Sequence, residues 1–189
     1  MATKPADDTL DALERDQGYR AVDKWDRPRI GKDTTRVLLW PRPKTGGIFR
    51  FQPESSREWK RRQAAAFGRA FDDIFTQGAW CLYVDELRYV TERLGFEEDM
   101  ETFWQQGRAM NISVVACAQR PAHVPLSMYS QATHLFLWRT NDETDLRRLG
   151  GIGFADSKQI RETVARLELH DVLYVNSRTG RLAITRVSM

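Results

Sequence analysis

Short apolar runs alternate with amphipathic segments along most of this chain. The runs at 36–40, 80–84, 112–118 and 134–139 have the length and composition of buried strands, and the segments between several of them show helical spacing. This alternation predicts an α/β fold with a mainly parallel sheet flanked by helices. Two further runs, 172–175 and 182–187, enclose a turn at Thr179-Gly180 and predict a C-terminal antiparallel hairpin. A turn at Gly46-Gly47 predicts an edge strand over 48–51.

The helix boundaries carry their own signals. Ser55 followed by Glu58 forms a capping box, and apolar side chains at helical spacing continue to Gly78. A second amphipathic helix is predicted over 97–110. Two shorter helices are predicted to begin after Asn141 or Asp142 and after Asp156. The chain is therefore divided into an N-terminal helix and linker, 1–35, and an α/β domain, 36–189.

Composition narrows the class of protein. The chain has 189 residues, of which 41% are hydrophobic and 29% charged, values typical of globular domains. No apolar run approaches the roughly 20 residues that a membrane helix needs. Cys81 and Cys117 both lie in apolar runs and are predicted to be reduced core thiols, which favours a cytoplasmic location. The histidines and cysteines show no metal-ligand spacing.

Charge is distributed unevenly although the net charge is only +3. Between residues 27 and 69 there are twelve Lys/Arg and three Asp/Glu, whereas residues 70–101 hold nine Asp/Glu and two Arg. The basic segment could contact nucleic acid phosphates. A solvated helix face and loop would have the same composition, including the cluster around Arg57, Lys60 and Arg61.

The strand-like run 80–84 leads directly into two carboxylates, Asp85 and Glu86. In open α/β sheets, ligands bind at the carboxyl ends of strands. One carboxylate there can hold Mg²⁺ and the next can orient a water for attack on a phosphoryl group. Acidic residues at strand ends are also common without any catalytic role, so this motif alone leaves both interpretations open.

The next stretch favours the catalytic interpretation. A helix, the strand-like run 112–118 and then Gln119-Arg120-Pro121 resemble the sensor segment of FtsK/HerA-type P-loop ATPases, which are ring-forming motors that move DNA. The resemblance covers 36–187 and is strongest to ATP-binding proteins of actinobacteria and their phages. It implies that 36–189 is a partial P-loop ATPase domain with an incomplete RecA-like core, the C-terminal portion of a DNA-translocating motor.

The family's functional residues can be carried over onto the matching positions. The resemblance implies that Asp85 fixes Mg²⁺, that Glu86 polarises the attacking water and that Gln119 senses the terminal phosphate of ATP. Arg139 is the first candidate for an arginine finger offered to a neighbouring subunit. Arg147 and Arg148 are the next candidates. Both can also be interpreted as helix-surface residues near acidic neighbours. The implied partners are ATP, DNA and like subunits in a homo-oligomeric ring.

One element of the family is missing from the sequence. A phosphate loop needs G-x-x-x-x-G-K-[ST] between a strand and a helix. The nearest match, at 31–35, has Asp26 at the position of the first glycine and Asp33 at the position of the Ser or Thr. We therefore expect the phosphate loop to come from a separate chain or a longer product. Without it, Asp85 and Glu86 would repel a triphosphate, and the chain alone is predicted to bind ATP poorly and not to hydrolyse it.

Two other functions remain open. The chain could be a catalytically inactive ATPase-fold scaffold, which the missing loop favours and the set of Asp85, Glu86 and Gln119 opposes. It could also be a DNA-binding subunit that uses the basic segment 27–69. The aromatic residues, Trp138 among them, lie at core spacings, which argues against base stacking.

Overall fold

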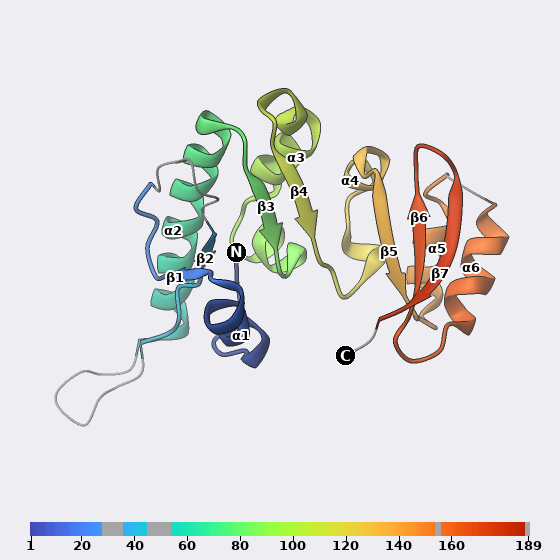
Figure 1. Cartoon of the computed structure of the whole chain (residues 1–189), viewed down its shortest axis with the longest axis horizontal. Helices are drawn as coiled ribbons and strands as arrows, with labels where there is room; N and C mark the ends of the chain where they lie inside the picture. The colour runs from blue at the N-terminus through green and yellow to red at the C-terminus, as the bar shows by residue number, and fades with distance from the viewer. Residues whose placement is uncertain (28–35, 45–53, 154–155, 188–189) are drawn as a thin grey trace. The chain divides into compact units, whose positions relative to one another are not determined.

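The computed structural model describes residues 1–27, 36–44, 54–153 and 156–187. The edge strand predicted over 48–51 and the glycine-containing stretch 31–35 lie outside the described residues. The chain divides into two compact units, Met1–Cys117 and Ala118–Met189. Each unit has its own strands and helices (Figure 1).

The strands of the first unit form two parallel pairs. β1 (Arg20–Val22) pairs with β2 (Val37–Leu39), and β3 (Cys81–Val84) pairs with β4 (Ser113–Ala116). Backbone hydrogen bonds from the first two residues connect the pairs, because the Ala2 amide donates to the Leu39 carbonyl at 3.0 Å and the Asp85 amide donates to the Met1 carbonyl at 3.2 Å. The N-terminal backbone thus lies between β2 and β3.

Helix α2 (Ser56–Gln77) follows the boundaries predicted from the sequence. The Ser55 hydroxyl accepts from the Glu58 amide and the Glu58 carboxylate accepts from the Ser55 amide, which confirms the capping box. The helix ends at Gly78, whose φ of 66° is in the left-handed region that favours glycine. Its buried face includes Phe67 and Phe71.

The other helices of this unit are shorter. They are α1 (Asp8–Gln17), capped by the Asp7 side chain, the π-helical turn η1 (Tyr89–Arg93), α3 (Glu97–Gln106) and the 3-10 turn η2 (Gly107–Met110). Phe103 of α3 packs on Phe71 of α2 with ring centroids 5.5 Å apart. The predicted helix 97–110 is therefore confirmed as α3 continued by one 3-10 turn.

One face of the β3–β4 pair is open, contrary to the prediction of helices on both sides. Tyr83 is 44% exposed and its neighbour Val115 is 48% exposed. Cys81 and Cys117 are free and exposed, so the prediction of core thiols is wrong. An apolar run shows that a strand can be buried, but it does not show what covers each face.

The second unit contains an antiparallel sheet. Its elements are η3 (Pro121–His123), α4 (Leu126–Gln131), β5 (His134–Trp138), α5 (Glu143–Gly150), α6 (Ser157–Arg166), β6 (Asp171–Asn176) and β7 (Arg181–Arg186). β6 lies between β5 and β7 and is antiparallel to both, which confirms the terminal hairpin. Within the described residues, parallel pairing is confined to β1–β2 and β3–β4, so the expected mainly parallel sheet is found only in part.

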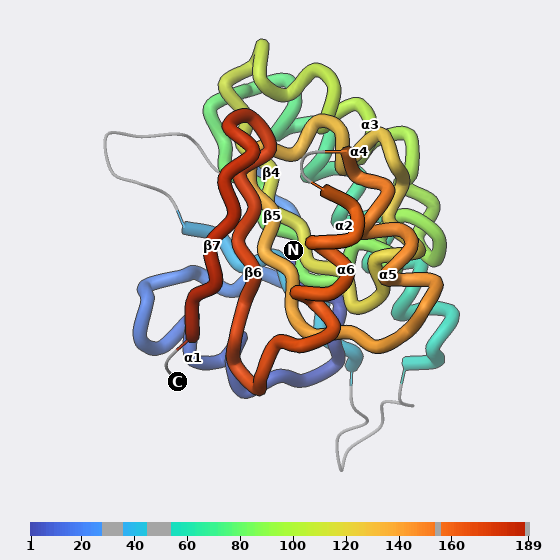
Figure 2. The backbone as a smooth tube through the Cα atoms, turned by 90° about the vertical axis from the view of Figure 1, so that its right-hand side faces the viewer, coloured from blue at the N-terminus to red at the C-terminus, as the bar shows by residue number. Residues whose placement is uncertain are grey.

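Two capped helices close the core of this unit. The Asp142 carboxylate accepts from the Thr144 and Asp145 amides at the start of α5, and the Asp156 carboxylate accepts from the Gln159 amide at the start of α6. Both caps were predicted. Figure 2 shows α5 and α6 beside β5, β6 and β7. The buried residues of the hydrophobic cluster that these helices form with the sheet are Leu137, Leu146, Leu149, Ile160, Val164, Leu167, Leu173 and Val175.

Candidate functional site

The two carboxylates follow the end of β3 at the place where β4 also ends. Val84 pairs with Ala116, the Cys117 amide donates to the Val84 carbonyl at 2.9 Å, and the Leu87 amide donates to the Cys117 carbonyl at 2.8 Å. This bonding extends the parallel ladder past both strands. It fixes the backbone on either side of Asp85 and Glu86 against the end of β4.

Asp85 has a buried oxygen without a hydrogen-bond partner in the described structure. Its side chain is 15% exposed, and the Oδ2 atom is fully buried and accepts no hydrogen bond. Buried carboxylate oxygens are ordinarily satisfied, and one that is not calls for a cation or a water. The nearest cation is Lys4, whose Nζ lies 3.9 Å from Oδ2 and 2.7 Å from Asp7 Oδ2.

Glu86 lies next to Asp85 and is half-buried. Partial burial raises the pKa of the Glu86 carboxyl, and the negative charge of Asp85 raises it further, against a lowering by the Arg88 backbone N–H. A carboxyl with a raised pKa is a better proton acceptor near neutral pH than an ordinary surface glutamate. These are the electrostatics expected of a general base beside a second carboxylate.

The carboxylates after β3 offer few ligands for a metal ion. Among the described residues, no group of three or more His, Cys, Asp or Glu could hold a metal ion. Mg²⁺ commonly keeps several waters and takes one or two protein carboxylates together with substrate phosphates. The unsatisfied Oδ2 of Asp85 fits such a site, whereas the site lacks the ligands for a tightly bound structural metal.

Gln119 belongs to the second unit and is exposed. It follows Cys117 by two residues, so the chain holds its Cα within about 7 Å of the Cys117 Cα. Whether its side chain converges on Asp85 and Glu86 stays a prediction.

The residues after Gln119 are held by a network to α5. Arg120 Nε donates to Asp145 Oδ2 at 2.8 Å, and the Ala122 amide donates to Asp145 Oδ1 at 2.9 Å. Arg120 also pairs with Asp142 at 2.9 Å, and Arg148 donates to the Ala122 carbonyl at 3.2 Å. Asp145 is only 1% exposed, so this buried carboxylate fixes the segment that immediately follows Gln119.

The arginines considered for a finger differ in their environments. Arg139 follows β5 and is exposed. Arg147 forms an ion pair with Glu143 at 3.2 Å, as its helix-surface interpretation predicted. Arg148 donates a hydrogen bond to the Ala122 carbonyl. Arg139 is therefore the most available of the three, and its role stays a prediction.

Sequence reasoning missed two residues of this region. Lys4 precedes Asp85 by 81 residues, and only the pairing of the N-terminal backbone with β3 places it near that carboxylate. Asp145 was not predicted as part of the site, and it is the buried partner of Arg120. A buried acid in the first turn of an amphipathic helix gives no sequence signal that separates it from an N-terminal dipole partner.

Comparison with known proteins identifies the fold. No family model matches the chain, and no curated protein matches it by sequence. The DNA-packaging ATPase B204 from Sulfolobus turreted icosahedral virus superposes with a TM-score of 0.53 at 17% identity. That match covers 65% of this chain and 58% of the viral one, so the chain spans less than two thirds of that protein.

Two structures of the genome-packaging NTPase B204 from Sulfolobus turreted icosahedral virus 2 match as well. The complex with ATP-γS gives a TM-score of 0.56 at 15% identity and covers 96% of this chain and 88% of the viral chain. The complex with AMPPCP gives 0.55 at 15% identity, with coverages of 82% and 69%. The chain thus has the mixed α/β fold of viral genome-packaging NTPases. No described helix is long and apolar enough to cross a membrane.

Proposed function

We propose that the chain is the C-terminal portion of a DNA-translocating motor ATPase of the FtsK/HerA type and supplies carboxylates for ATP hydrolysis. The observation that carries the proposal is the parallel β3–β4 ladder, which fixes Asp85 and Glu86 together at the carboxyl ends of two strands. The fold shared with B204, a protein solved with ATP-γS and with AMPPCP, supports nucleotide as the ligand class.

Each site residue has a distinct task in this proposal. Asp85 offers its unsatisfied Oδ2 to Mg²⁺, and the metal would neutralise phosphate charge when bound. Glu86 accepts a proton from the attacking water, which its raised pKa favours. Gln119 hydrogen-bonds the terminal phosphate or the water, and Arg139 is offered to a neighbouring subunit of a ring.

In this proposal a separate chain or a longer product supplies the phosphate loop, since the sequence given contains no G-x-x-x-x-G-K-[ST]. Backbone N–H groups and a lysine of such a loop offset the charge of a triphosphate. Asp85 and Glu86 alone repel it. The purified chain should therefore show no ATP affinity in the micromolar range, which titration calorimetry with ATP and Mg²⁺ would measure.

The catalytic role of Glu86 is tested in the complete motor, purified with the phosphate loop on a separate subunit or on the longer product. Glu86→Gln keeps the shape of the side chain but removes the base, so ATP turnover should fall about 10²- to 10⁴-fold. Glu98→Gln, at an exposed position of α3, is the matched control and should hydrolyse ATP normally. Unchanged turnover in Glu86→Gln would contradict the proposal.

A catalytically inactive scaffold is the second candidate, and one observation favours it. The Lys4 ammonium group, 3.9 Å from Asp85 Oδ2, competes with Mg²⁺ for that carboxylate. In a scaffold, Asp85→Asn would leave the ATPase rate of the complete motor unchanged. In the motor subunit that we propose, the same substitution abolishes the metal-dependent rate.

A further inference from the structure

The three-stranded sheet of the second unit has one face covered by helices and one open face. Leu137 and Leu173 pack on the covered face, together with residues of α5 and α6. Side chains alternate between the faces of a strand, so Phe136 and Trp138 point the other way. They are 55% and 56% exposed. Trp138 is thus not a core residue, contrary to the prediction from its spacing.

The strand register places nine residues on this side of the sheet, and all of them except Val172, which is 1% exposed, are at least partly accessible. His134 pairs with Asn176, Phe136 with Tyr174 and Trp138 with Val172, and each β6 residue pairs in turn with one on β7. None of the nine is acidic, and four carry an aromatic or imidazole ring. They are His134, Phe136, Trp138, Val172, Tyr174, Asn176, Arg181, Ala183 and Thr185.

The rings on the open face are ordered against one another. Tyr174 lies between two of them, with its ring centroid 5.3 Å from that of Phe136 and 5.9 Å from that of His134. The His134 and Tyr174 rings are stacked with an interplanar angle of 16°, and His134 Nδ1 is 2.8 Å from the Tyr174 hydroxyl. This contact holds the central ring in place before any ligand arrives.

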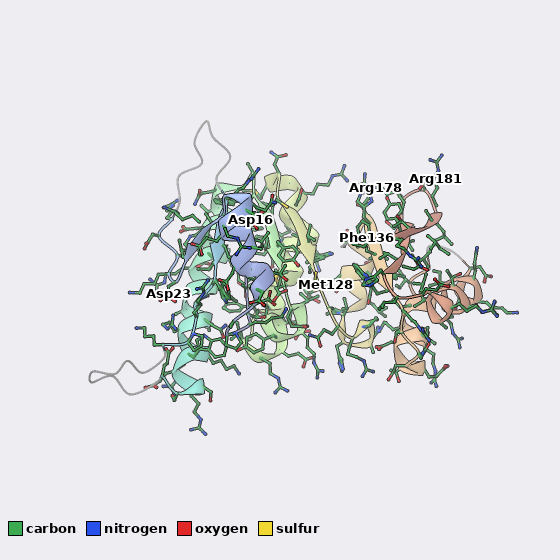
Figure 3. The ribbon with its side chains drawn as sticks, turned by 60° about the horizontal axis from the view of Figure 1, so that its bottom comes forward. Asp16, Asp23, Met128, Phe136, Arg178 and Arg181 are labelled. Carbon is green, nitrogen blue, oxygen red and sulfur yellow. The ribbon has the colours of Figure 1, made fainter. Side chains whose placement is uncertain are left out.

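Positive charge borders the rings at the hairpin end. Arg181 starts β7 on the open face, and Arg178 lies in the turn before it (Figure 3). Neither forms an ion pair within the part of the chain that the structure describes. Arg186, at the far end of β7, is instead paired with Asp171 and Glu168. The open face therefore combines exposed rings with two available guanidinium groups and no carboxylate.

We propose that this open face binds single-stranded nucleic acid. Bases stack on Phe136, Tyr174 and Trp138, and phosphates contact Arg178 and Arg181. Flat aromatic surfaces with nearby arginines recognise unpaired bases, because every base has a π-face available only when it is unstacked. An apolar polypeptide would bury the rings equally well but would leave the two arginines without counter-charges. The site requires no ATP and is built from residues of the second unit alone.

Fluorescence anisotropy of a labelled dT20 oligonucleotide, titrated with the full chain at 50 mM salt, tests the proposal. Phe136→Ala and Trp138→Ala should each weaken binding about 5- to 150-fold, the range for one lost base stack. The matched control is Leu169→Ala, because Leu169 is 78% exposed but lies outside the sheet. Circular dichroism verifies that each variant is folded.

The salt dependence tests the arginines. Replacing Arg178 and Arg181 together by alanine should reduce the slope of log Kd against log salt by about 1.4, since each phosphate contact to a single strand contributes about 0.7. Arg166→Ala, an exposed arginine of α6, is the control and should leave the slope unchanged.

Three outcomes would overturn the proposal. The first is the absence of dT20 binding at 100 μM chain. The second is binding that Phe136→Ala and Trp138→Ala change by less than twofold, which would mean that the open face is covered by protein instead. The third is that the chain binds duplex DNA as tightly as dT20 and loses this binding only when Arg57, Lys60 and Arg61 are replaced. That result would place the nucleic-acid site on the basic segment. Because no arm of the experiment uses ATP, its result is independent of the proposed hydrolysis.

Discussion

Removing the buried carboxylate of Asp145 is expected to destabilise the second unit and to release the segment after Gln119. In Asp145→Ala, Arg120 loses its Nε partner at 2.8 Å and the Ala122 amide loses its acceptor at 2.9 Å. The change removes a side chain that is 2% exposed, so no water replaces the carboxylate without rearrangement.

The magnitude follows from the burial of the two partners. Breaking a fully buried ion pair costs about 3–5 kcal/mol, and a hydrogen bond to a charged group contributes about 1.5–3 kcal/mol. Arg120 is 47% exposed and keeps its contact with Asp142 at 2.9 Å, which lowers the cost. We expect a loss of about 2–3 kcal/mol in the free energy of unfolding.

Urea unfolding followed by circular dichroism measures this loss. Asp145→Ala, Arg120→Ala and the double variant form a cycle that should give a coupling energy of about 1–2 kcal/mol. Glu143→Gln is the control, because Glu143 makes only exposed ion pairs and its loss should cost less than about 1 kcal/mol. A coupling energy below about 0.5 kcal/mol would refute the reasoning.

Three further predictions concern the first unit. Glu86→Gln should stabilise the chain increasingly as pH rises above about 4, because the raised pKa of Glu86 means that its ionisation disfavours the folded state; equal pH profiles of variant and wild type would contradict this. Gly78→Ala should lower the thermal stability more than Gly18→Ala. Both glycines have a positive φ, which costs alanine about 1–2 kcal/mol. Of these two positions, only at Gly78 would the added Cβ meet a backbone oxygen, that of Met110 at 2.5 Å. Ser55→Ala should lower the unfolding free energy by about 1 kcal/mol through loss of the cap, and a neutral effect by chemical denaturation would show that the cap does not stabilise α2.

Local signals predicted most of the elements. Ser55 and Gly78 bounded α2, and Asp142 and Asp156 began α5 and α6, because caps depend on residues within one helical turn. The hairpin was likewise visible from its turn. Parallel pairing was harder to predict, since the partner of β5 is β6 and not a strand of the first unit.

Contacts between distant residues set the environment of the candidate site, and the sequence did not reveal them. The apolar run 112–118 could not show that one face of β4 is open at Val115. The approach of Lys4 to Asp85 depends on backbone bonds of Met1 and Ala2. The pair Asp85 and Glu86 was nevertheless predictable, because position at a strand end is a local property.

The two exposed thiols have a practical consequence for handling the protein. Cys81 and Cys117 are free, so oxidation in air can cross-link two molecules, and purification calls for a reductant. The same exposure makes both accessible to maleimide dyes. In a Cys81→Ser background, a single dye on Cys117 would sit two residues before Gln119 and report optically on changes at that junction.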